Sequence, residues 1–494
     1  MGSVGRPMFK NENAEKFQSN EATIQPNGYL IVLDTYDLRV VKASTNFNRI
    51  VVGGAKTILG HTFDELFGAA ITANLRRRIN QEGRTLMLIS GDFPLFDQRR
   101  FNCFVQTVDN RIIFEMEESQ ENAEASTEQT VALTEAVASF GKVRSIEELI
   151  ELIPPELKKL SGFDRVMVYK LDQAMTGRII SERVSPGMGS LLNFSFPAQD
   201  ITLETCEQYC RNTVRAVPDS NYEPAALIGD SEHTDLSNCA LASASKNHID
   251  HLRKNGIGAS LSISIVCNGR LWGLIVCHHR KPKPIHHWLR SYCEVVGKLI
   301  SLRISAYEDG TERDLKEKLR RFFEMIRKNP TRNALESELL NNAPTILELF
   351  DGKGMALISG DTIRTFPITP ASVDISKYAD WLRKTDQKHF FIEDNLRSKF
   401  PLEGMIETAS GVITMSFPAH DMSIHIFRPE LTQTFTWASS IFMSVEKTPS
   451  NTNPFEVLRQ TIEKHSAPWT LNQMFMAQVF FDSMKNALAA VENK

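Results

Sequence analysis

The chain has no apolar run approaching the roughly 18 residues that cross a bilayer. Its opening segment, MGSVGRPMFKNENAEKF, has no apolar core after its charges, so it does not resemble a signal peptide. Lysine and arginine number 56 against 60 aspartates and glutamates, which leaves no basic excess to attract a phosphate backbone. These absences predict a soluble cytoplasmic protein that binds neither membrane nor nucleic acid.

Cysteine is also scarce, and its seven copies form no disulfide framework because they are odd in number and scattered. Cys206 and Cys210 lie four residues apart, and Cys277 precedes His278 and His279. Neither cluster has the second closely spaced Cys/His pair that a structural zinc site requires. We therefore expect reduced thiols and no metal site.

Catalytic motifs are missing as well. The sequence has no Walker loop, GxSxG elbow, HExxH motif or GxGxxG turn between a strand and a helix. It also lacks the nucleotide-binding glycine boxes and the phospho-acceptor helix of a histidine kinase. We predict that this chain is not an enzyme, and that any kinase or other signalling output belongs to sequence beyond it.

What the chain does contain is a threefold succession of strands and helices. A length of 494 residues favours about three domains, and a polar, acidic stretch at 117–130 marks one boundary. The predicted fold class is α+β, with three consecutive antiparallel-sheet sensor domains joined by long helices. Their predicted bounds are 20–120, 131–305 and 309–494.

Local signals place several elements. Residues 99–118 read as two strands joined at Asp109-Asn110, and Asn268-Gly269 joins two alternating apolar runs as a hairpin. SIEELIELIPPELKKLSG and SKNHIDHLRKNG read as helices. From about 285 to 327 the pattern is helical, with an expected interruption at Asp309-Gly310. GMALISG, ASGVITMSFP and MSIHIFRPE predict strands of the third domain.

A helical seam within 285–327 admits two interpretations. Its apolar residues repeat at spacings of four, three and four, preceded by two isoleucines on the same stretch: Leu315, Leu319, Phe322, Ile326, Ile300 and Ile304. Such a seam can pack along the same helix of a second chain, which predicts a homodimer through a helical spine. It can equally bury the helix against its own domains.

Polar residues gather in the middle domain. Ser260 and Ser262 alternate on one strand and so share a face, while His248 precedes the hairpin and His278 ends it. Asp200 follows an aromatic run, and Arg211 and Arg215 are one turn apart. This set suits a cavity for a large planar apolar ligand with carboxylates. The alternative is a set of surface and capping residues.

These residues, taken in order, resemble a phytochrome over almost the whole chain, from about Ile24 to Trp469. The matching segments are IQPNG at 24–28, FDRVMVY at 163–169, FPAQDI at 196–201, DLS at 235–237, NHIDHL at 247–252, SLSISIVCNGRLWGLIVCHH at 260–279, FRPE at 427–430 and SAPW at 466–469. The resemblance implies successive PAS, GAF and PHY domains. It also implies a knot linking the first two domains and a tongue-like PHY hairpin that covers a linear tetrapyrrole such as biliverdin in the GAF pocket.

The same resemblance implies the residues of that pocket: Asp200, Tyr169, Tyr209, Arg215, His248, Ser260, Ser262 and His278. Asp200 and His248 would hold the pyrrole nitrogens and their shared water. Arg215 and the two serines would meet the propionates.

Both of the family's usual thioether cysteines are absent. Ala14 stands where bacterial members carry one, and Asn247 where plant and cyanobacterial members carry the other. A bilin would therefore be held at most noncovalently, unless Cys239 or another pocket thiol forms the bond.

Other family positions also differ. Asn27, Gln199, Thr202, His251 and Ala242 replace a histidine, a serine, a proline, a tyrosine and a propionate-binding arginine.

The tongue is predicted to be shortened or altered. Its PRxSF motif corresponds to NTNPF, with Thr452 at the arginine position, so Asp200 lacks its usual charged partner. Arg428 of FRPE is predicted to brace the PHY sheet.

Two hypotheses remain from the sequence. One is a sensory photoreceptor module with a noncovalent bilin, and the other is a bilin-free sensor or protein-interaction module that has lost photochemistry.

Overall fold

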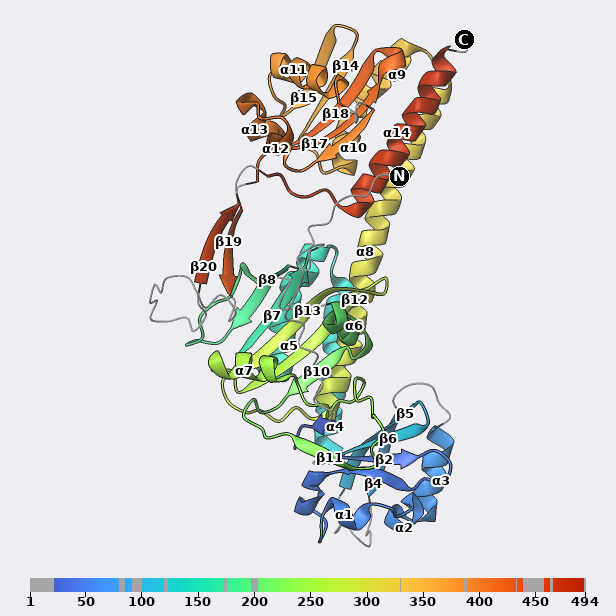
Figure 1. Cartoon of the computed structure of the whole chain (residues 1–494), viewed down its shortest axis with the longest axis vertical. Coiled ribbons are helices and arrows are strands. Elements are labelled where there is room, and N and C mark those ends of the chain that lie inside the picture. Colours follow the sequence, from blue (N-terminus) through green and yellow to red (C-terminus); the bar gives the residue numbers. More distant parts are fainter. Residues whose placement is uncertain are drawn as a thin grey trace.

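A computed structural model describes residues 22–79, 85–90, 100–119, 123–172, 176–196, 203–328, 330–385, 389–431, 433–438, 457–462 and 465–492. Three sheets follow one another along an elongated molecule, and one long helix runs beside the second and third (Figure 1). The predicted α+β class, with three sheet domains joined by long helices, is confirmed. Within the described residues, no helix is both long and apolar enough to span a bilayer.

The first sheet has seven strands, and one comes from the second domain. Its order is β1 (Thr23–Ile24), β11 (Ala225–Gly229), β3 (Val40–Ser44), β2 (Tyr29–Asp34), β6 (Arg111–Glu118), β5 (Arg100–Val108) and β4 (Thr85–Ser90). Short helices α1 (Ala55–Ile58), α2 (Phe63–Phe67) and α3 (Ala69–Arg78) belong to the same domain. The predicted pair of strands joined at Asp109-Asn110 is confirmed as β5 and β6.

The first two domains interlock through β1 and β11. The Gln25 side chain donates hydrogen bonds to the carbonyls of Ala216 (2.9 Å) and Ala242 (3.2 Å) in the second domain. In return, Asp230 just after β11 accepts from Arg111 of β6 at 2.9 Å. Hydrogen bonds therefore join the two domains in both directions, while the predicted knot of the N-terminal segment stays a prediction because residues 1–21 lie outside the described part of the chain.

In the described residues, the second sheet has eight strands. Its order is β10 (Val214–Val217), β12 (Ala259–Cys267), β13 (Arg270–His279), β7 (Arg165–Leu171), β8 (Gly177–Val184), β9 (Phe194–Phe196), β19 (Gln433–Ala438) and β20 (Val457–Ile462). The Asn268-Gly269 hairpin is confirmed, with both turn residues at positive φ (50° and 75°), as a type I′ turn requires.

The last two strands of this sheet belong to the third domain. The tongue hairpin β19–β20 reaches back toward the second domain, and β19 pairs in parallel with β9 (Figure 1). Thr452 and the rest of NTNPF lie outside the described residues. The predicted alteration of the tongue therefore stays a prediction.

Helices α4 (Ala123–Lys142), α5 (Ile146–Ser161) and the first half of α8 (His287–Lys328) cover one face of the second sheet. The predicted interruption at Asp309-Gly310 is wrong, because α8 is continuous over 42 residues. A helical glycine costs only about 1 kcal/mol relative to alanine. The burial of Ile300 and Ile304 on one side of it and Leu319 on the other outweighs that cost.

The third sheet has the order β15 (Thr362–Pro367), β14 (Gly354–Ser359), β18 (Met422–Arg428), β17 (Gly411–Phe417) and β16 (Phe390–Glu393), which confirms the three predicted strands. The helices of this domain are α9 (Arg332–Asn341), α10 (Ala343–Leu349), α11 (Ser372–Arg383), α12 (Leu396–Lys399), α13 (Glu403–Ala409) and α14 (Leu471–Glu492).

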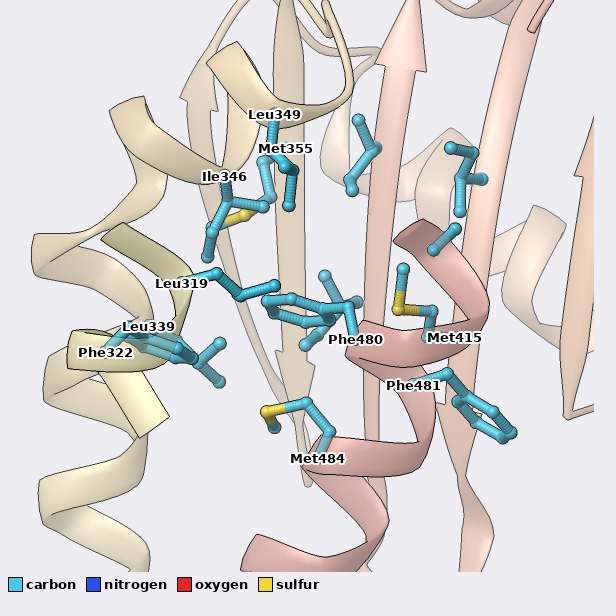
Figure 2. Packing of buried hydrophobic residues seen from close by; sticks show 14 of the residues in the cluster. Leu319, Phe322, Leu339, Ile346, Leu349, Met355, Met415, Phe480, Phe481 and Met484 are labelled. Atoms are coloured by element: carbon cyan, nitrogen blue, oxygen red, sulfur yellow. The ribbon is translucent and has the colours of Figure 1, made fainter. Parts of the chain in front are cut away.

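The apolar seam of α8 packs against other elements of its own chain. Leu319, Phe322 and Ile326 are 8%, 3% and 1% exposed and pack in one cluster with Phe480 of α14 and Met415 of β17. Figure 2 shows Leu319 and Phe480 pointing toward each other between α8 and the sheet. Ile300 and Ile304 are fully buried against the second sheet. The prediction that this seam faces a second chain is wrong, because its residues are buried in the hydrophobic cores of the second and third domains of the same chain.

Candidate functional site

The second sheet has one face for its own core and one for a site. On β12, Leu261, Ile263 and Ile265 lie in the cluster formed with α5 and α8. Because side chains alternate along a strand, Ser260 and Ser262 point to the opposite face. The sequence prediction that these two serines share a face is confirmed, and α6 (Leu203–Arg211) and α7 (Lys246–Lys254) belong to this side.

Strand register brings the polar residues of this face into rows. Arg215 of β10 is the cross-strand partner of Ser262. Ser260 is the partner of His278, and His278 is in turn the partner of Arg165 on β7. Directly opposed side chains on one face lie close together. Residues spread over more than a hundred positions therefore form one polar strip.

An apolar surface adjoins the strip. Met167, Tyr169, Ile179, Leu191 and Leu274 form a buried cluster, with Tyr209 and Phe196 packed against it.

The ring of Tyr169 lies 5.3 Å from that of Phe196, centre to centre. It also lies over Gly177, where a Cβ atom would come within 1.9 Å of the ring. Only glycine at 177 leaves room for this placement of Tyr169.

Tyr209 and Arg215 link α6 to the strip. The guanidinium carbon of Arg215 lies 5.5 Å from the centre of the Tyr209 ring, and its Nη1 donates to Gln208 Oε1 at 3.4 Å. Burial raises the pKa of the Tyr209 phenol, while the charge of Arg215 and a hydrogen bond with Ser262 oppose the shift. A cation, a phenol and a hydroxyl thus meet at one point.

His248 lies in the first turn of α7 and is coupled electrostatically to Arg215 of the strip. Ser245 caps α7 by accepting the backbone N–H of His248 at 3.3 Å. The side chain remains accessible to solvent, yet desolvation by its neighbours, followed by the charges of His251 and Arg215, lowers the pKa of His248 to about 4.

His278 lies in the strip between Ser260 and Arg165 and is buried. It is 7% exposed, and burial, then Arg165, His251 and His248, hold its pKa well below the usual value. Among the described residues, no group forms a hydrogen bond with its Nδ1. A buried imidazole nitrogen without a partner carries a desolvation cost, which a polar group of a ligand would relieve.

Sequence reasoning missed the ion pair beside His278. Arg165 Nε lies 3.0 Å from Glu182 Oε1, with both side chains almost completely buried. Glu182 also accepts the backbone N–H of Leu191 at 3.1 Å. The signal was present, because Arg165 interrupts an apolar strand at FDRVMVY, and a buried cation requires a counter-charge.

Most predicted site residues come together, with two exceptions. Asp200 lies outside the described residues. Cys239, the alternative attachment thiol, is 2% exposed in a cluster between the first two domains, where Gln106 contacts its Sγ at 3.0 Å. Cys239 is therefore not on the site face. In the described part of the chain, no three or more Cys, His, Asp or Glu side chains are arranged to hold a metal ion.

One expected result tests the electrostatics of the strip. Arg215→Gln should raise the pKa of His248 above about 4, because it removes one of the cations that disfavour protonation. NMR titration of the histidine ring protons measures this shift. Arg211→Gln is the control, since Arg211 is exposed and paired with Glu207 on the same helix. An unchanged His248 pKa in the Arg215 variant would mean that the two groups are not coupled.

The sign of the pH effect on stability follows from the same lowered pKa. Between the usual value of 6.5 and about 4, the unfolded chain binds a proton at His248 that the folded chain does not. His248 therefore contributes a loss of stability as the pH falls through this window.

The architecture defines a class, a three-domain module in which a polar strip lies beside an apolar surface on one face of the middle sheet. Family models match each of the three domains: the PAS fold matches residues 14–119, the GAF domain residues 145–306 and the phytochrome region residues 318–492. The chain belongs to the phytochrome family as a PAS–GAF–PHY sensory module.

Among curated relatives, the chain is 28% identical to cyanobacterial phytochrome B of Nostoc sp., covering 91% of this chain and 62% of that protein. It is also 28% identical to the bacteriophytochrome of Xanthomonas campestris, covering 90% and 74%. The chain spans 61–62% of the length of the three cyanobacterial relatives.

Solved structures agree with the fold. The bacteriophytochrome RpBphP3 of R. palustris matches with a TM-score of 0.72 and 25% identity, covering 95% of this chain and 97% of that one. The phytochrome photosensory core module of Stigmatella aurantiaca matches with a TM-score of 0.74 and 24% identity, covering 96% of each chain.

Proposed function

We propose that this chain is a photosensory module whose GAF recess holds a linear tetrapyrrole such as biliverdin without a thioether bond. The unpartnered Nδ1 of buried His278 is the observation that carries the proposal. His278 lies in the polar strip with Ser260, Ser262 and Arg215, beside the apolar surface formed by Met167, Tyr169 and their neighbours. This combination of one wide apolar surface and a row of polar groups suits a flat ligand with carboxylates at one edge.

When bound, the tetrapyrrole supplies the conjugated system that absorbs visible light. The chain's residues hold and orient it. Arg215 and the two serines would bind the propionate carboxylates, because a guanidinium and hydroxyls donate to carboxylate oxygens. His248, neutral above a pH of about 4, can accept a hydrogen bond from a pyrrole N–H, and we assign the same role to Asp200. Tyr169 and Tyr209 would pack against the rings.

The test is an absorption spectrum of the full chain co-produced with a source of biliverdin. A red band should survive gel filtration, disappear in denaturant and leave no zinc-induced fluorescence on the protein after denaturing electrophoresis. A noncovalent ligand is lost by mass action once its concentration falls below its Kd, so the spectrum is recorded at several dilutions. A fluorescent protein band would contradict the noncovalent part of the proposal. Absence of any band would favour the bilin-free sensor instead.

The Ala14→Cys variant is the matched gain of function. It restores the thiol at the position where bacterial relatives attach their bilin, so we expect a covalent, fluorescent adduct in this variant alone. If neither protein binds the bilin, the recess itself has changed, and the bilin-free sensor hypothesis gains support.

We also propose that the module forms a homodimer, through a different face of α8 from the buried seam. Val295 and Leu302 are seven residues apart on α8 and 47% and 69% exposed. Val131 of α4 is 52% exposed. Apolar residues at heptad spacing favour packing along a second helix. Leu302→Glu should convert dimers to monomers in light scattering across a dilution series, whereas a monomeric parent at high concentration would refute the dimer.

A further inference from the structure

The two ends of the tongue meet at one place on the PHY domain. The backbone N–H of Leu431, where the chain leaves for the tongue, donates to the carbonyl of His465, where it returns, at 2.7 Å. The next residue, Ser466, donates from its backbone to the Asp394 carbonyl at 2.9 Å. The returning segment then passes directly into α14. The base of the tongue and the start of the last helix are thus neighbours.

Arg428, at the end of β18, holds this junction. Its Nη1 donates to the carbonyls of Ala467 (2.9 Å) and Pro468 (3.0 Å) in the returning segment. The guanidinium carbon lies 3.8 Å from the centre of the Trp469 ring. The side chain is almost fully buried, so these contacts are shielded from water.

The same guanidinium reaches two further elements. Its Nη2 donates to the carbonyl of Phe350 (2.8 Å) and its Nε to that of Asp351 (3.2 Å), both just after α10. Nη2 also donates to Gln473 Oε1 at 3.0 Å. All the nitrogens of the side chain are therefore engaged, and lysine cannot reproduce such a fork. The prediction that Arg428 braces the PHY sheet is confirmed.

Gln473, in the first turn of α14, caps the start of this helix together with Thr470. Its Oε1 accepts the backbone N–H of Thr470 at 2.9 Å, and its own backbone N–H donates to Thr470 Oγ1 at 3.1 Å. This reciprocal pair is a capping box, which satisfies donors that the helix start leaves free. Arg428 thus binds one atom of the group that fixes where α14 begins.

We propose that Arg428 is a positioning residue that couples the tongue to α14, by fixing the returning segment Ser466–Trp469 and the cap of α14 to the sheet as one unit. A displacement at the tongue base is then passed to α14, which packs through Phe480 on α8. This coupling needs no bilin and no charged partner for Asp200. The experiment that tests it is therefore independent of the proposed function.

The test is a double-mutant cycle read by hydrogen exchange of the full chain. One change is Arg428→Gln, and the other replaces residues 433–462 with a Gly/Ser linker. In the parent background, tongue replacement should raise exchange at residues 471–478 at least about threefold, because α14 loses a restraint. In the Arg428→Gln background the same replacement should leave exchange there unchanged.

Two outcomes overturn the proposal. In the first, tongue replacement raises exchange at residues 471–478 equally in both backgrounds. In the second, tongue replacement leaves exchange there unchanged in the parent. Arg364→Gln on exposed β15 is the matched control and should preserve the threefold response. Arg428→Lys keeps the charge but should behave as Arg428→Gln, because it lacks the fork.

A second route reaches the junction without replacing Arg428, although the Cβ added there would also lie 3.3 Å from Arg428 Cβ. At Gly411, the first residue of β17, an added Cβ would lie 2.1 Å from Ser466 Oγ. Gly411→Ala should displace the returning segment and abolish the response of residues 471–478 to tongue replacement. If Arg428→Gln fails to fold, this variant decides the question alone, and a persisting threefold response would overturn the proposal.

Discussion

Leu319→Glu is expected to unfold the PHY domain while leaving the six strands that the GAF domain contributes to the second sheet folded. Leu319 is 8% exposed and packs with Phe322, Phe480 and Ile346 between α8, α14 and α10 (Figure 2). A carboxylate there has no cation within the cluster to pair with. An uncompensated buried charge costs about 3–5 kcal/mol, a large part of the 5–15 kcal/mol that stabilises a typical domain.

Denaturant unfolding followed by circular dichroism measures this loss. In the variant, the PHY domain should unfold at a lower denaturant concentration than the rest of the chain. Leu302→Glu is the matched control on the same helix, because Leu302 is 69% exposed and its replacement should leave the unfolding transition of the monomer unchanged. A Leu319→Glu protein that is fully folded but dissociated would restore the interpretation of the seam as a contact between chains.

Arg215→Ala is expected to weaken biliverdin binding about 10- to 100-fold. Arg215 is the cross-strand partner of Ser262. Removing one partner of an enclosed charge pair costs a few kcal/mol, with each tenfold in Kd equal to about 1.4 kcal/mol. Fluorescence titration with biliverdin measures the change. Arg211→Ala is the matched control and should bind as the parent does, because Arg211 is 63% exposed at the end of α6, whereas Arg215 lies on β10. The prediction that the two arginines lie one helical turn apart is therefore wrong.

The dimethyl ester of biliverdin separates charge from shape. Since the ester has no carboxylates, its affinity should be nearly equal in the parent and in Arg215→Ala. An equal loss for acid and ester would show that Arg215 acts through packing on Tyr209 instead, where its guanidinium lies 5.5 Å from the ring centre. Unchanged binding of both ligands would place the bilin elsewhere.

The elements that the sequence predicted are those set by neighbouring residues. The hairpin at Asn268-Gly269 follows because both residues tolerate the positive φ of a type I′ turn. Helix α5 begins at its cap, Ser145, whose side chain accepts the backbone N–H of Glu148 at 3.1 Å, and ends before Gly162 at φ 63°. Such signals act within a few residues and do not depend on the rest of the chain.

The site was predictable in its residue types but not in its arrangement. Alternation on β12 places Ser260 and Ser262 on one face from sequence alone. Their opposition to His278 and Arg215 depends on strand register across three strands, which distant segments determine together. The pair of Arg165 and Glu182 was missed for that reason, since the two residues meet only when β7 and β8 are aligned.

The sequence by itself determined the order of the domains and the residue types of the predicted site, because these are properties of residues at fixed positions. Only the tertiary structure decided which surface each apolar helix face meets. The spacing of Leu319 and Phe322 is the same for a seam within one chain or between two, and the closing of α14 over them selects the first. Likewise, only the folded chain brings Arg428 to the tongue base, because its partners lie about 40 and 80 residues away and no local pattern pairs them.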